Sequence, residues 1–133
     1  MVLPTKNWQE AYFEEADKFS GESMNDEILT KQSFCHRCPI GCGRVVNLDG
    51  KDVGGPEYEP LWAYGSNCGV IDLKVISECN RLCNEYGLDA ISVPCTIASA
   101  MELYQRGYIT EEECEGVPLV WGSTEAIIEW TKR

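Results

Sequence analysis

The stretch DLKVISECNRLCNEYGLDAISVPCTIASAMELYQRG (residues 72–107) contains two helix patterns with a short break between them. In its first half, Asp72 is a good N-cap, apolar side chains recur every three or four residues, and Gly87 suits the left-handed position after a helix. In its second half, Ser92 is the expected cap, Pro94 suits a first turn, and an apolar stripe ends at Gly107. The sequence therefore predicts helices over residues 72–87 and 92–107.

Helix patterns also occur on both sides of this pair. Residues 7–21 have apolar side chains at helical spacing and a glycine stop, which predicts a helix there. Thr110 and Glu113 form a capping box, and Ser123 is the expected start of a last helix. Most of the chain is therefore expected to be helical.

Strand signals are confined to residues 43–55, where valines lie on both sides of Asp49-Gly50. This dipeptide accepts the positive φ angles of a tight turn, so we expect one small hairpin. Glycines and prolines in residues 54–69 exclude a long regular element, although the aromatic side chains there are expected to be buried. The predicted fold class is mainly α, a multihelical single domain over residues 1–133 with at most one short β-hairpin.

The chain is acidic, with 22 Asp and Glu against 11 Lys and Arg and a net charge of −11. Because nucleic-acid binding depends on basic side chains that displace counterions, we expect no nucleic-acid partner. No apolar run is long enough to cross a bilayer, and the first residues lack a signal-peptide pattern, so we expect no membrane partner and a cytoplasmic location.

The segment SFCHRCPIGCGR (residues 33–44) places Cys35, Cys38 and Cys42 within eight positions. In a reducing compartment, clustered thiols bind metal more often than they form disulfides. Zinc sites usually have a second ligand pair downstream, whereas iron-sulfur clusters combine close cysteines with a distant one. The spacing favours an iron-sulfur cluster, with zinc and buried or redox thiols as the alternatives. His36 is expected to be exposed.

The other cysteines have weaker patterns. Cys79 and Cys83 lie one turn apart on a predicted helix and are expected to be small core residues. Cys68, between glycines, is the best fourth ligand within the chain, because glycines allow close approach of the backbone to a cluster.

Three stretches in one order resemble the tungsten-containing aldehyde ferredoxin oxidoreductase family: CHRCPIGCGR, then GGPEYEPLWAYGSNCG, then LCNEYGLDAIS leading into TIASAMELYQRG. The segments LPTKNWQEAYFEEADKFSGE and LVWGSTEAIIEW also resemble the flanks of those motifs, so the resemblance covers nearly the whole chain. It is a resemblance to the central helical part of such an enzyme, between an N-terminal sheet domain and a C-terminal helical domain.

The resemblance implies a tungstopterin enzyme that oxidises aldehydes to carboxylic acids and passes electrons through a 4Fe-4S cluster to ferredoxin. It makes Cys35, Cys38 and Cys42 three cluster ligands, with the fourth in the C-terminal domain, outside these 133 residues. It leaves open tungsten or molybdenum, the particular aldehyde, a homodimer, and the related enzymes that reduce aromatic thioesters.

The pterin-contacting motif of this family corresponds to NEYGLD, residues 84–89. The resemblance therefore implies pterin contacts by Asn84, Gly87, Leu88 and Asp89, although the family has an aspartate where Asn84 lies. An amide can accept or donate a hydrogen bond, so Asn84 is expected to bind the pterin more weakly than a carboxylate.

Two glutamates complete the resemblance. Glu59, in GPEYEP, matches the family's residue for proton handling. Glu78 matches a glutamate that binds a metal between subunits in some members, but the histidine of that site has no counterpart here.

We expect the chain to act with the remaining domains of the same enzyme and to be inactive toward aldehydes by itself, because its pterin motif occurs once and two pterins need two sets of contacts. The alternatives are a free-standing iron-sulfur or zinc module that docks to a larger redox partner, and an electron carrier. A carrier is disfavoured because only three clustered cysteines are evident.

Overall fold

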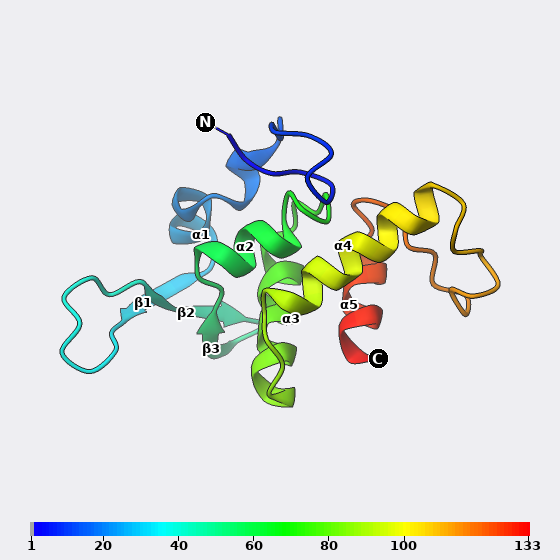
Figure 1. The fold of residues 1–133 in the computed structure, drawn as a ribbon. Helices are drawn as coiled ribbons and strands as arrows, with labels where there is room; N and C mark the ends of the chain where they lie inside the picture. Colours follow the sequence, from blue (N-terminus) through cyan, green and yellow to red (C-terminus); the bar gives the residue numbers. More distant parts are fainter. Residues whose placement is uncertain (1) are drawn as a thin grey trace.

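The computed structural model describes residues 2–133 and confirms the mainly helical class. Figure 1 shows a small sheet on one side of α2 and α3, and α4 and α5 on the other side. Within the described residues, each helix is too short or too polar to span a bilayer. In chain order the elements are η1 (Ala16–Phe19), α1 (Gly21–Glu27), β1 (Leu29–Ser33), β2 (Gly43–Leu48), β3 (Lys51–Gly55), α2 (Tyr58–Tyr64), α3 (Leu73–Tyr86), α4 (Ser92–Gln105) and α5 (Thr124–Lys132).

The sheet is antiparallel, in the order β1-β2-β3. Asp49 and Gly50 have φ of 50° and 84°, so the predicted hairpin between β2 and β3 is confirmed with two consecutive left-handed residues at its turn. The sheet is larger than the single hairpin that we expected, because β1 also pairs with β2 as far as Ser33 and Gly43. That pairing needs no local turn, so the sequence pattern gave no signal for it.

The two central helices form where they were predicted. Asp72 caps α3, since its Oδ1 accepts the N–H groups of Lys74 at 3.0 Å and Val75 at 3.1 Å. Gly87 ends α3 in the left-handed conformation, with φ of 69°. The predicted Ser92 cap of α4 is wrong, because the Asp89 carboxylate accepts the N–H groups at this helix start instead.

The ends of the chain differ in how well they were predicted. The predicted last helix is confirmed: Ser123 Oγ accepts the Ala126 N–H at 3.1 Å and α5 follows. The capping box also forms, since Glu113 accepts the Thr110 N–H at 2.8 Å, but only turns follow it.

The predicted helix over residues 7–21 is wrong. Lys6, Asn7 and Trp8 have φ of 48°, 52° and 66°, which a right-handed helix excludes, and only the short η1 lies within that range. The Lys6 N–H donates to Ser66 O at 3.0 Å, so the backbone is held by the loop after α2. Tertiary hydrogen bonds have overridden the helical spacing of the side chains.

Helix α3 lies at the centre of the helical part and packs against α2, α5 and strands β2 and β3. Its Ile76 is fully buried with Tyr64 of α2, Met101 of α4 and Ile127 of α5, and Val46 extends this core to the sheet. Burial of these apolar side chains is the main stabilising contribution to the fold. The two ends of α3 are thereby held in fixed positions, and the C-terminal one leads directly into the predicted pterin motif.

Candidate metal and cofactor site

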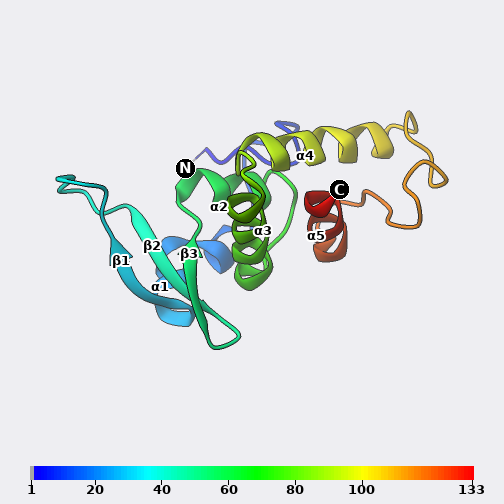
Figure 2. The same ribbon diagram turned by 90° about the horizontal axis from the view of Figure 1, so that it is seen from below.

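The three predicted cluster cysteines lie on one loop, residues 34–42, between β1 and β2. Figures 1 and 2 show this loop projecting from the outer end of the sheet, away from the helices. The Cys38 N–H donates to Cys35 O at 3.0 Å, so the first two cysteines are joined by a turn. Cys35 and Cys42 are exposed, Cys38 is partly buried, and all three thiols are free.

Close packing around Cys42 explains the glycines on both sides of it. A Cβ at Gly41, whose φ is 62°, would lie 2.2 Å from Phe34 Cε1. A Cβ at Gly43 would lie 2.3 Å from Ser33 Oγ. A Cβ would therefore displace the Phe34 ring at Gly41 or the Ser33 hydroxyl at Gly43, and at Gly41 the positive φ also disfavours any other residue.

The loop fits the chemistry of an iron-sulfur cluster in its donors. Cys35, Cys38 and Cys42 supply three thiols without disulfides, and thiolates are the usual protein ligands of such clusters. Within residues 2–133, however, no three His, Cys, Asp or Glu side chains are gathered closely enough to hold a metal ion. The chain thus brings three candidate ligands onto one loop without gathering them closely enough to hold a metal ion.

Cys68 lies elsewhere, in the core. Its thiol is fully buried and donates to Ala63 O at 3.3 Å and Pro94 O at 3.5 Å, between α2 and α4. Burial raises the pKa of this thiol, which opposes formation of the thiolate that a cluster requires. These contacts give no support to Cys68 as the fourth ligand.

The predicted pterin-contacting residues lie together at an exposed corner between α3 and α4, which we call the α3–α4 corner (residues 84–89). The Leu88 N–H donates to Cys83 O at 2.8 Å and closes the end of α3. Hydrogen bonds from the Ser92 and Ile91 N–H groups hold the pKa of the Asp89 carboxyl below its ordinary value. Exposed Asn84 and Asp89 thus lie on either side of the left-handed Gly87.

This corner fits a polar ligand with both donors and acceptors, because Asn84 provides an amide and Asp89 a carboxylate. A cavity of about 480 Å³ opens beside Leu88, between α4 and α5, and Ile97, Leu119 and Trp130 contribute to its lining. Of the four candidate residues, Leu88 lines this cavity, whereas Asn84, Gly87 and Asp89 do not. The residues present therefore suit one side of a pterin site.

Glu59 lies on the first turn of α2 and is exposed. The aromatic side chains around it are only partly buried: Tyr58 is 63% exposed, Trp62 is half-buried and Tyr64 is fully buried. The expected burial of this segment's aromatics is therefore wrong for Tyr58. Within residues 2–133, no hydrogen bond or ion pair joins Glu59 to the cysteine loop or to the α3–α4 corner.

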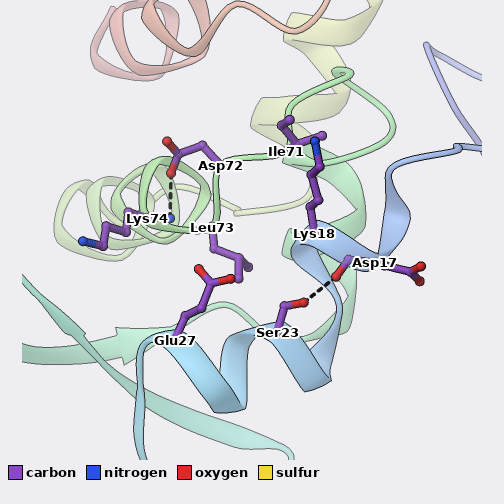
Figure 3. A pocket seen from close by; sticks show the side chains of 8 residues that line it. All are labelled: Asp17, Lys18, Ser23, Glu27, Ile71, Asp72, Leu73 and Lys74. Atoms are coloured by element: carbon purple, nitrogen blue, oxygen red, sulfur yellow. Dashed lines mark hydrogen bonds between the residues drawn. The ribbon is translucent and has the colours of Figure 1, made fainter.

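The polar cavity in Figure 3 lies at the other end of α3 and has a volume of about 540 Å³. Its walls come from η1, α1 and the start of α3, where Ser23 Oγ donates to Asp17 O and Asp72 caps the helix. None of the predicted cofactor ligands lines it. The structure thus keeps this hollow apart from the candidate site.

Glu78 is engaged in an ion pair on the surface of α3. Its carboxylate lies 2.5 Å from the Arg81 guanidinium, which also pairs with Glu85. The hydrogen bonds from Arg81 hold the pKa of the Glu78 carboxyl below its ordinary value. In this chain the Glu78 carboxylate is therefore paired with Arg81 of the same helix.

The family of the chain follows from comparison with known proteins. The family model described as aldehyde ferredoxin oxidoreductase, domains 2 and 3, matches residues 1–133. The chain belongs to this family of oxidoreductases.

Among curated relatives, the chain is 48% identical over 128 residues to the tungsten-containing aldehyde ferredoxin oxidoreductase of Thermococcus kodakarensis, covering 95% of the chain and 21% of that protein. It is 46% identical to the Pyrococcus furiosus protein of the same name, again over 95% of the chain and 21% of the relative. The aliphatic sulfonate oxidoreductase WOR-like subunit of P. furiosus is 33% identical, over 92% of the chain and 20% of that protein. The chain thus spans about a fifth of these relatives.

Among solved structures, the active site complex BamBC of benzoyl coenzyme A reductase, in complex with 1,5-dienoyl-CoA, matches with a TM-score of 0.71. The match covers 97% of this chain and 19% of that one, at 21% sequence identity. At this identity the likeness concerns the fold alone.

Proposed function

We propose that this chain contributes three cluster cysteines and one set of pterin contacts to an enzyme that oxidises aldehydes. The observation that carries the proposal is the cysteine loop: Cys35, Cys38 and Cys42 are free thiols on one projecting loop, in a chain of this family. Three close thiols with a fourth ligand from elsewhere suit a 4Fe-4S cluster better than a zinc site.

In the proposed reaction, the aldehyde and one water together form the carboxylic acid and release two protons and two electrons, and the electrons pass to ferredoxin. Tungsten, or molybdenum, held by two pterins supplies the two-electron oxidation when it is bound. From this chain, Asn84 and Asp89 bind pterin polar groups, and Glu59 takes up a proton from the reacting groups. Exposure of all three side chains leaves them free to meet groups outside this chain.

The relatives named for tungsten and aldehyde are the more similar ones, which favours aldehyde oxidation over the reduction of aromatic thioesters. A free-standing metal-binding module is the alternative. This module would hold an iron-sulfur cluster or zinc. Metal content separates the proposal from a zinc module, since the proposal requires iron with sulfide on the cysteine loop.

The test is reconstitution of the chain under anaerobic conditions with iron, sulfide and a small thiol that serves as the fourth ligand. We expect bound iron and sulfide with a visible absorption band, and complete loss of both in Cys38→Ala. Cys95→Ala is the matched control, because this partly buried thiol lies on α4, outside the loop. Zinc alone, or iron content that Cys38→Ala leaves unchanged, would contradict the ligand assignment.

A second measurement concerns turnover. The chain alone is expected not to reduce a viologen dye with a simple aldehyde. Catalysis requires an active site that is closed to water, and this chain supplies only one side of it. Sustained aldehyde-dependent dye reduction, lost in Glu59→Gln, would show instead that these 133 residues form a complete active site.

A further inference from the structure

A chain of buried hydrogen bonds joins three helices beneath the α3–α4 corner. The Tyr64 hydroxyl of α2 lies 3.2 Å from Cys83 Sγ of α3 and 3.0 Å from Thr131 Oγ1 of α5. Thr131 Oγ1 in turn donates to Ile127 O at 2.6 Å. Tyr64 and Cys83 are fully buried and Thr131 nearly so, which makes one hydroxyl the meeting point of α2, α3 and α5.

The donor and acceptor of each hydrogen bond follow from the group at the end of this chain of bonds, the backbone carbonyl of Ile127. A backbone carbonyl only accepts, so Thr131 uses its one proton on Ile127 O and must accept from Tyr64. Tyr64 then has no proton left for Cys83, and the Cys83 thiol donates to the Tyr64 oxygen. Burial raises the pKa of both Cys83 and Tyr64, so both groups keep their protons at neutral pH.

The same cysteine also fixes the corner through its backbone. Cys83 O accepts the Gly87 N–H and, at 2.8 Å, the Leu88 N–H. Its side chain is thus bound to Tyr64 in the core while its carbonyl closes the turn that carries the candidate pterin contacts. Asn84 directly follows Cys83 in the sequence, so this residue is held from the core side as well.

We infer that Tyr64 is a positioning residue, which acts through Cys83 to hold the α3–α4 corner in its binding conformation. That this conformation serves binding rests on the proposed function, in which the corner contacts a pterin. A corner held before the ligand arrives loses less conformational entropy on binding than a mobile one, so this network favours binding. Within residues 2–133, Tyr64 itself has no exposed surface through which to contact a ligand.

The test is amide hydrogen exchange of the chain without cofactor, comparing wild type with Tyr64→Phe. Removal of the hydroxyl leaves the Cys83 thiol without its acceptor, and we expect exchange at Gly87 and Leu88 about tenfold faster, as for the loss of one buried hydrogen bond. Tyr86→Phe is the matched control, because it makes the same change on an exposed ring next to Gly87. Its rates are expected to equal those of the wild type.

A stability control separates positioning from general support of the fold. Ile76→Val removes one buried methyl group away from the network and lowers overall stability. It is expected to leave exchange at Gly87 and Leu88 unchanged. The inference is overturned if Tyr64→Phe leaves those two rates unchanged, or if Ile76→Val raises them as much.

The thiol gives a second pair of variants, which also covers the case that Tyr64→Phe does not fold. Cys83→Ser keeps a donor for the Tyr64 oxygen and is expected to retain slow exchange at Leu88, whereas Cys83→Ala is expected to accelerate it. Equal rates in the two variants would overturn the inference. Since no cofactor is present in these measurements, a negative result leaves the iron and aldehyde tests of the proposed function untouched.

Discussion

The cysteine loop and the α3–α4 corner both carry candidate ligands, but the chain supports them in opposite ways. The loop projects from the end of the sheet, with Phe34 60% and Ile40 77% exposed and its thiols free. The corner is closed by hydrogen bonds to Cys83 O and Asp89, and Cys83 is anchored in the core. The conformation of the corner is thus fixed by contacts within this chain, whereas the three thiols of the loop are not gathered by any such contacts among the described residues.

The largest expected effect tests this difference through apolar side chains. Ile76 of α3 is fully buried, so Ile76→Ala is expected to lower the free energy of unfolding by about 2–5 kcal/mol. Ile40 of the cysteine loop is exposed, so Ile40→Ala is expected to change it by less than about 0.5 kcal/mol. Urea denaturation of both variants is the measurement, and similar losses would mean that the loop is part of the core.

The next effect compares two glycines with positive φ. A Cβ at Gly87 meets nothing within 4 Å, so Gly87→Ala has only backbone strain to bear and is expected to lower stability by about 1–2 kcal/mol. At Gly41 a Cβ would overlap the Phe34 ring, so Gly41→Ala is expected to displace the loop.

Because Gly41 lies next to Cys42, its substitution should also reduce the iron bound after reconstitution, whereas Gly87→Ala should leave iron unchanged. Urea denaturation and iron analysis of the same two variants check both outcomes. Iron content lowered by Gly87→Ala and retained in Gly41→Ala would reverse the comparison.

The sequence predicted the corner well because its signals are local. Asp72, the apolar spacing of α3 and Gly87 all act within a few residues, and each is found in its expected role. The assignment of the α4 cap to Ser92 failed because Ser92 is already the first residue of the helix, and Asp89, three residues earlier, accepts the Ile91 and Ser92 N–H groups. Local patterns thus located the helix without identifying which of two polar residues caps it.

The sequence predicted less where distant segments decide the backbone. Residues 7–21 have helical spacing, but hydrogen bonds from Lys6 and Asn7 to the loop after α2 impose left-handed conformations. Strand β1 is short and mostly polar, and its partner β2 lies beyond the cysteine loop. The spacing of the cysteines indicated a shared loop, but how far their sulfurs stand apart depends on contacts that no local pattern encodes.

A smaller effect is expected at the start of α3. Asp72→Ala removes the acceptor of two N–H groups and is expected to lower the free energy of unfolding by about 1 kcal/mol. Asp72→Asn keeps an acceptor oxygen and should lose less. Thermal unfolding of both variants gives the comparison, and an equal loss in the two would show that the charge of Asp72, and not its hydrogen bonds, stabilises the helix.

The smallest effect concerns acid and the Asp89 carboxylate. The N–H groups of Ser92 and Ile91 hold its folded pKa below the ordinary value of 3.8, so the unfolded chain binds this proton more readily. The contribution of Asp89 to stability is therefore fully present above about pH 3.8 and is lost as the pH falls through the lowered folded pKa.

Asp89→Asn keeps one acceptor oxygen but does not titrate. The difference in unfolding free energy between wild type and Asp89→Asn is thus expected to be largest near neutral pH and to shrink on acidification. Urea titrations at several values between pH 2 and 6 measure it, and a difference that does not vary with pH would show that ionised Asp89 does not stabilise the corner.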